Sequence, residues 1–264
     1  MRHALFILTA LLVLLFEGKT NPWMTVEPFW MHLAGQPEST LASQPTVEIT
    51  VIHDDSAPRI VLRSWFYAAQ NSPEERRQMQ AAIRFWNDQS GRFGYRLGRG
   101  RQAKVYRLHF QLAEAAGHYD ENNFFIPVAN TNLHSLNQVQ VVADQALARV
   151  PASSPQRVVA GYAPQNFVYI AASHSDNLMV GIHEIGHRLG AGHAAGVMHC
   201  ALDHPTSHVA RQTIREILAT AGIIGKGKQA LQLARHFRAR GVQLAIEGRP
   251  PAGLYREGQI SRLR

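Results

Sequence analysis

The segment from Gly181 to Cys200, GIHEIGHRLGAGHAAGVMHC, constrains this chain more than any other. His183 and His187 are four residues apart. On an α-helix, at about 1.5 Å and 100° per residue, their imidazoles lie on one face roughly 6 Å apart. This spacing suits two ligands of a tetrahedral zinc ion. Glu184, about a quarter turn from His183, is placed to act as a general base rather than as a ligand. The segment therefore predicts a helix that carries a zinc site.

A third ligand requires that the helix end. Gly190 and Gly192 accept a left-handed backbone conformation, so the chain can turn and bring His193 to the metal. The complete pattern is H-E-x-x-H-x-x-G-x-x-H. The alternative, an amphipathic helix with histidines on a solvated face, explains neither the two glycines nor His193.

The pattern resembles the active site of the metzincin clan of zinc endopeptidases. The resemblance implies one catalytic Zn²⁺ on His183, His187 and His193, and peptide-bond hydrolysis by a zinc-activated water with Glu184 as general base. It also implies an α+β fold with a zincin-like twisted mixed sheet, an antiparallel edge strand, an active-site helix and a C-terminal helix. In this clan a methionine lies in a turn under the histidines, and Met198 occupies the matching position.

The segment after His193 departs from the family pattern in two ways. Only four residues separate His193 from Met198, which implies a small pocket wall. The astacin branch reads Val-Met-His-Tyr here, and this chain has Cys200 in place of the tyrosine. Cys200 lines the site, binds zinc as a thiolate, or is an inert buried residue. The last is favoured, because a thiolate would displace the water that hydrolysis needs. His199 is a candidate substrate contact.

The approach to the helix resembles the matrixin branch of the clan. Residues 158–162, VVAGY, match its edge strand, and residues 167–172 match the partner strand. The N–H and C=O groups of an edge strand can pair with an extended peptide; an ordinary inner strand is the alternative. The candidate substrate-binding residues of this strand are Val158, Ala160 and Tyr162.

Two features bear on the compartment. Residues 1–16 begin with Arg2 and His3 and continue as an apolar run that is shorter than the roughly 20 residues needed to span a bilayer. We predict a signal peptide and export to the extracellular space or periplasm. An uncleaved membrane anchor stays open, because no small-x-small pair follows. The single cysteine, Cys200, excludes an intrachain disulfide, and no earlier cysteine is present to keep a pro-enzyme latent.

The composition is that of a globular protein, with 45% hydrophobic and 17% charged residues among 264. Much of the net charge of +8 lies in residues 223–264, where nine Lys or Arg face Glu247 and Glu257. An anionic polymer is the candidate partner of this stretch, and a solvated surface is the alternative. No specific nucleic acid is predicted, and we expect a monomer. The expected parts are residues 1–20 (signal peptide or anchor), 21–56 (lead or pro-segment), 57–222 (catalytic domain) and 223–264 (basic C-terminal extension).

Local patterns predict the elements around the site. Ser72, Pro73 and Glu75 form a capping box that begins a helix ending at Gly91. The polar stretch 117–132 is predicted to be a loop; its Asp120 is a candidate ligand of a structural cation, with a solvated loop as the alternative. Strands are expected at 47–51, 60–67, 105–112, 138–143 and 167–172, and further helices from 178 and from 205 to 219.

Three functions stay open. The first is an exported zinc endopeptidase. The second is an exported, zinc-stabilised binding module whose basic tail engages an anionic polymer or a protein partner. The third keeps the hydrolytic chemistry but acts on peptide cross-links of a cell wall. The carboxylate of Glu184 in the base position favours hydrolysis over binding alone.

Overall fold

The computed structural model describes residues 46–54, 56–97, 104–129, 135–148, 159–164, 166–199, 208–221, 223, 243–247 and 259–263. Several predicted parts lie outside these residues: the signal peptide, most of the lead segment, Val158, Cys200, most of the basic extension and the polar stretch at 130–134. The helix expected from residue 205 begins instead at Arg211, because the described residues 208–210 are not helical.

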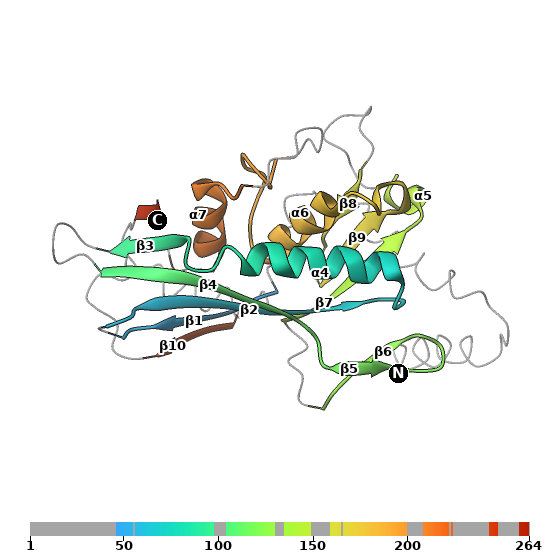
Figure 1. The fold of residues 1–264 in the computed structure, drawn as a ribbon, viewed down its shortest axis with the longest axis horizontal. Helices are drawn as coiled ribbons and strands as arrows, with labels where there is room; N and C mark the ends of the chain where they lie inside the picture. The colour runs from blue at the N-terminus through green and yellow to red at the C-terminus, as the bar shows by residue number, and fades with distance from the viewer. Residues whose placement is uncertain are drawn as a thin grey trace, which may run out of the picture. The chain divides into compact units, whose positions relative to one another are not determined.

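A nine-stranded mixed sheet forms the frame of the described structure (Figure 1). Its main path runs β11-β3-β4-β2-β7-β9-β8, and β1 pairs with β2 and with β10. Strands β4, β2, β7 and β9 run parallel to one another, whereas β8 is antiparallel to β9. The strands are β1 (Glu48–Ile52), β2 (Arg59–Ala68), β3 (Phe93–Leu97), β4 (Lys104–Glu114), β7 (Leu136–Val142), β8 (Gly161–Tyr162), β9 (Phe167–Ala171), β10 (Gln243–Glu247) and β11 (Gln259–Arg262). The expectation of an α+β fold with a mixed sheet is confirmed.

The helices α4 (Pro73–Asn87), α6 (Leu178–Arg188) and α7 (Arg211–Thr220) pack on one face of this sheet, with the short α5 (Asp144–Leu147) and a 3₁₀ turn (Ala172–His174) near α6 (Figure 1). Every second side chain of β4 is apolar and faces these helices. Tyr106, Leu108 and Phe110 are buried, and the ring centroid of Phe110 lies 5.7 Å from that of Trp86 on α4. The core lies between the sheet and these helices.

The predicted capping box at the start of α4 is present. The Glu75 amide donates to the Ser72 hydroxyl (3.2 Å), and the Glu75 carboxylate accepts from the Ser72 amide (3.4 Å). That carboxylate also accepts from the amides of Gln70 (2.8 Å) and Val141 (3.2 Å), so it joins the helix to β7. Glu75 is 1% exposed, and burial raises the pKa of its carboxyl group against the influence of these hydrogen bonds.

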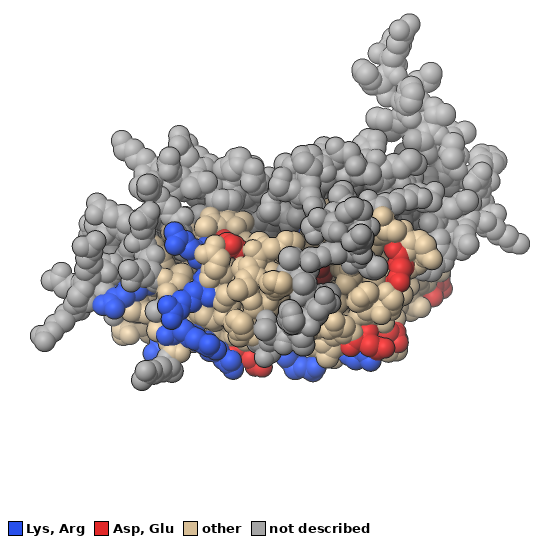
Figure 2. Space-filling view, turned by 90° about the horizontal axis from the view of Figure 1, so that it is seen from above, with Lys and Arg blue, Asp and Glu red and all other residues tan. Residues whose placement is uncertain are grey.

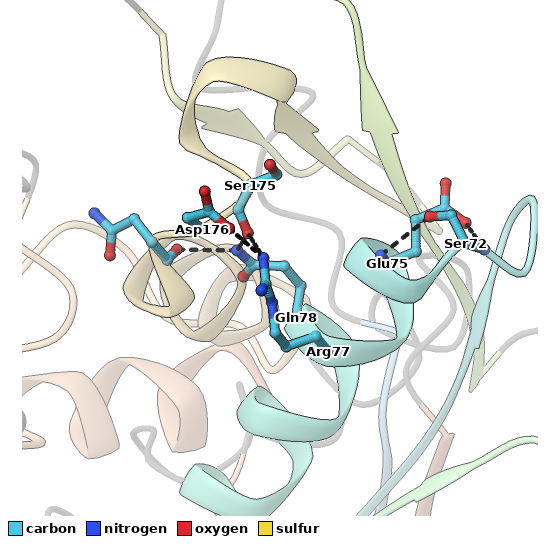
Figure 3. Close-up of polar contacts among 7 residues, drawn as sticks. Ser72, Glu75, Arg77, Gln78, Ser175 and Asp176 are labelled. Carbon is cyan, nitrogen blue, oxygen red and sulfur yellow. Dashed lines mark hydrogen bonds and ion pairs between the residues drawn. The ribbon is translucent and has the colours of Figure 1, made fainter.

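Helix α4 fixes the position of α6. The Gln78 side chain donates to the carbonyls of Ser175 (2.6 Å) and Asn177 (3.0 Å) and accepts from the amide of Gly181 (3.2 Å). Figure 3 shows Gln78 and the neighbouring Arg77 reaching from α4 toward Ser175 and Asp176, at the entry to α6. At the next residue, the Ile182 carbonyl accepts from the Trp86 indole N–H (3.0 Å). These contacts set both the rotation and the depth of α6.

The structure contains elements that the sequence pattern did not predict. Strand β3 was missed because it is short and has a glycine, Gly94, as its second residue. Part of the stretch expected to be a loop forms a second, two-stranded sheet from β5 (Gly117–Tyr119) and β6 (Phe125–Pro127). Strands β10 and β11, from after residue 222, were not predicted either, whereas the strand expected at 47–51 is confirmed as β1 and joins the same sheet.

Charges are unevenly distributed. On the face that Figure 2 shows, most Lys and Arg side chains lie toward one end and most Asp and Glu toward the other. Within the described part of the chain, no helix has the length and apolar character needed to cross a membrane.

Candidate metal centre

Helix α6 begins and ends with recognisable caps. The Asn177 side chain accepts from the Met179 amide (3.1 Å) at the N-terminus. At the C-terminus Gly190 takes a φ of 100°, its amide donates to the His187 carbonyl (3.0 Å), and the Ala191 amide donates to the Gly186 carbonyl (3.0 Å). This pair of bonds is a Schellman motif, which a residue with a side chain at position 190 would strain. The predicted role of Gly190 is confirmed.

Gly192 behaves differently from our expectation. Its φ is not among the positive values found in the described residues, so the prediction of a left-handed conformation there was wrong. Its amide donates instead to the Glu216 carboxylate of α7 (2.9 Å), and a Cβ at this position would lie 3.2 Å from the same oxygen. Gly192 therefore serves close packing against α7 rather than a turn.

The turn brings His193 back to the two helical histidines. One ligand nitrogen from each of His183, His187 and His193 lies within 4.8 Å of the others. The Nε2 atoms of His183 and His187 are 3.1 Å apart. Two ligands of a tetrahedral zinc, with Zn–N bonds of about 2.0–2.1 Å, are separated by roughly 3.3 Å. The donor set and its spacing therefore fit a single metal ion.

The far nitrogens of the two helical histidines are already engaged. His183 Nδ1 lies 2.9 Å from the Val197 carbonyl oxygen, and His187 Nδ1 lies 2.8 Å from that of Ala191. Because a carbonyl accepts only, each Nδ1 carries the proton and each Nε2 is left with a lone pair. Backbone groups that fix the ring and tautomer in this way are typical of metal-binding histidines.

The site opens to solvent on one side. His183 is buried, His187 is half-buried and His193 is exposed. Burial lowers the pKa of His183 to about 4 and that of His187 well below its usual value, so both imidazoles are neutral near pH 7. Neutral imidazole is the form that binds metal.

Glu184 directly follows His183 on α6 and is 6% exposed. Burial raises the pKa of its carboxyl group to about 8 in the metal-free protein, and the charge of Arg188 opposes that shift. Its side chain packs on the backbone of Gly161 in β8. A Cβ at Gly161 would be 2.8 Å from Glu184 Oε1 and 2.7 Å from Glu184 Cγ. A glycine at position 161 is therefore what allows the edge strand to approach the carboxylate.

Arg188 is a residue of the site that the sequence analysis missed. It is completely buried, and its guanidinium donates to the carbonyl of Ala163, just after β8. Its own carbonyl accepts from the Thr46 amide (2.9 Å). The spacing of Glu184 and Arg188, four residues on one helix, was visible in the sequence. Nothing in the sequence showed that the face they share is buried.

Met198 lies in a turn beneath α6. The His199 amide donates to the Gly196 carbonyl (2.9 Å), which closes the turn, and the adjacent Val197 carbonyl is the partner of His183. The Met198 side chain is fully buried and packs so closely on Gly186 that a Cβ there would overlap its sulfur. The turn thus supports the helix between the two ligand histidines.

The remaining candidate substrate contacts are His199, in the turn after the histidines, and Ala160 and Tyr162 at the edge of the sheet. His199 is exposed, and its charge contributes to the lowered pKa of His183. Tyr162 is half-buried in β8, opposite Tyr169 of β9, and the Ala160 carbonyl accepts from the Ala171 amide (2.9 Å). Strand β8 is the last strand of the sheet path, beside α6.

Asp120 gains no support as a cation ligand. Its Oδ1 accepts from the amides of Asn122 (2.9 Å) and Phe124 (2.8 Å) and so closes the turn between β5 and β6. Among the described residues, the three histidines are the one group of three or more side chains with metal-ligand spacing.

Comparison of the chain with protein-family models, with curated protein sequences and with solved structures gave no match. The functional assignment therefore depends on the geometry of the site itself.

Proposed function

We propose that this protein is an exported zinc-dependent endopeptidase with a metzincin-type active site and a zincin-like fold. One observation carries the proposal. One ligand nitrogen from each of three histidines lies within 4.8 Å of the others, and Glu184, whose carboxyl group is buried, directly follows His183 on α6. A structural zinc site usually has four protein ligands, whereas three ligands with an open side are typical of a catalytic one.

Each residue has a defined task in this proposal. His183, His187 and His193 hold the metal, which supplies Lewis acidity toward a water molecule and a peptide carbonyl when bound. Glu184 accepts a proton from the attacking water and transfers it to the leaving amine, as a general base and then a general acid. Met198 and the Val197 carbonyl keep His183 in its ligand orientation.

The edge strand provides a place for an extended substrate. Among the described strands β8 pairs with β9 only, and Glu184 packs on its Gly161. A peptide added along β8 would run past the carboxylate. Ala160, Tyr162 and His199 remain candidate substrate contacts in this proposal, with Val158 outside the described residues.

Removal of the metal tests the proposal. We expect the purified protein to cleave unfolded casein, to lose this activity with a zinc chelator, and to regain it with added Zn²⁺. At a free Zn²⁺ concentration 1,000 times the Kd, the unfolding free energy should also rise by about 4 kcal/mol. A protein that gains this stability with zinc yet cleaves neither casein nor peptide cross-links of cell walls is a binding module, and the proposal is then wrong. Cleavage of cell-wall peptides alone would keep the chemistry and change the substrate class.

A further inference from the structure

A second candidate site lies on the other face of the sheet. Arg59, the first residue of β2, is paired in register with Arg107 of the parallel strand β4, and Val61 is paired with His109. Residues that alternate with them, Ile60, Leu108 and Phe110, are buried in the core with the helices. Because side chains alternate along a strand, Arg59, Arg107 and His109 share the face that turns away from α4 and α6. Figure 1 shows β2 and β4 side by side, with α4 covering one face of this pair of strands.

These three side chains line a cavity of about 620 Å³. A volume of this size is within the range of small-molecule sites. Apolar walls come from Pro58 and Val105 and from Leu263, directly after β11. None of the described residues that line the cavity is acidic.

The two guanidinium groups have no counter-ion within the described structure. The one ion pair found there joins Arg77 and Asp176, elsewhere in the molecule. Like charges directly opposite each other on neighbouring strands are destabilising. Asp54 is engaged mainly elsewhere: its carboxylate accepts from the Ser56 amide (2.8 Å) and hydroxyl (2.7 Å), and the charge of Arg59 is the smallest of the influences on the lowered pKa of its carboxyl group.

The charges converge on His109. This side chain is half-buried, and burial lowers its pKa, with the positive charges of Arg59 and Arg107 lowering it further. A cavity that brings two guanidinium groups, neither in an ion pair with a described residue, together with an imidazole offers planar, charged donors for an oxyanion.

We propose that this cavity binds the tetrahedral oxyanion of a phosphate or sulfate ester, held by Arg59 and Arg107 beside His109, with the organic part of the ligand against Pro58, Val105 and Leu263. This cavity shares no described lining residue with the metal centre, and Leu263 is the one described residue of the basic C-terminal extension that lines it. Arginine suits it because its fork of N–H donors matches two oxygens of such a group.

The test is a titration of the full-length, zinc-loaded protein with inorganic phosphate and with sulfate, followed by NMR of the histidine ring signals and by calorimetry at physiological ionic strength. We expect saturable shifts of the His109 signals and unchanged His183 signals. The double variant R59Q/R107Q should bind at least tenfold more weakly. The matched variant R84Q/R215Q, which removes two exposed arginines on α4 and α7, should bind like the native protein.

Equal weakening in both double variants would mean general charge attraction and would overturn the proposal, as would the absence of a saturable shift at His109. If R59Q/R107Q does not fold, the single variants R59Q and H109N replace it with the same expected outcome. Polyphosphate and a sulfated polysaccharide, titrated in parallel, distinguish the two sources of the oxyanion. None of these measurements reads peptide cleavage, so failure here and failure of the proposed endopeptidase activity are distinguishable.

Discussion

Two backbone carbonyls fix the ring orientation and the tautomer of the helical histidines. Val197 and Ala191 each face an Nδ1 atom and thereby leave Nε2 of His183 and His187 directed at one point. Both carbonyls belong to the segment that follows α6, so the turn after the helix sets the tautomer of the ligands. Gly190 and Met198 therefore shape the candidate metal centre although neither is one of its possible ligands.

Gly161→Ala tests the contact between the edge strand and the base. The new Cβ would lie 2.7 Å from Glu184 Cγ and 2.8 Å from Val180 Cγ1, which is too close for either to stay in place. We expect the unfolding free energy to fall by about 1–3 kcal/mol and casein cleavage to decline, whereas zinc stoichiometry stays at one. Chemical denaturation and metal analysis measure these effects. A variant with native stability and native cleavage would show that β8 does not press on Glu184.

At the scale of elements, α6 depends on α4. The capping box at Ser72 and Glu75 could be recognised from the sequence, because its spacing is local. The contacts from Gln78 and Trp86 to α6 could not, because each joins residues about a hundred positions apart. The local sequence pattern therefore predicts where α4 begins, whereas its contacts with α6 become known only from the folded structure.

Glu75→Gln tests the buried carboxylate through the pH dependence of stability. The folded-state pKa of Glu75 is raised above its usual value of 4.5, so its favourable contribution is complete below about pH 4.5 and is lost as the pH rises through the folded pKa. We therefore expect the native protein to lose stability relative to E75Q between pH 4.5 and pH 7.5. Denaturation at several pH values measures the difference.

Glu74→Gln is the matched control, because Glu74 is exposed in the same turn of α4. Because E74Q keeps Glu75, it should lose stability with rising pH as the native protein does. A constant difference between E75Q and the native protein over the same range would mean that burial does not raise the pKa of Glu75.

At the scale of the whole molecule, the sheet does not stop at residues 57 and 222. Strand β1 pairs with β2 on one side and with β10 on the other, and β11 pairs with β3. We expect a fragment of residues 57–222 to be less stable than the full-length chain and to aggregate, because it exposes the edges of β2 and β3. Thermal unfolding and light scattering measure this. A fragment as stable and monomeric as the full chain would show that the outer strands are dispensable.

The site could be predicted from the sequence more completely than the fold. The relative positions of the site residues follow from their spacing in the sequence, because a helix and its C-terminal cap depend on local interactions. This applies to His183, His187, Gly190 and His193. Strand β3, the β5–β6 hairpin and the pairing of β10 with β1 carry no such signal, since they depend on contacts between distant segments. Arg188 is an intermediate case: its spacing from Glu184 was visible and its burial was not.

The most direct test of the central claim is the rate of casein cleavage by Glu184→Gln, compared with the native protein and with the control Glu74→Gln, all at one bound zinc per chain. We expect E184Q to keep the metal, because Glu184 is not a ligand, and its cleavage rate to fall by about two to four orders of magnitude. E74Q should cleave at the native rate. A folded, zinc-loaded E184Q that cleaves casein as fast as the native protein would contradict the assignment of Glu184 as the base and with it the proposed mechanism.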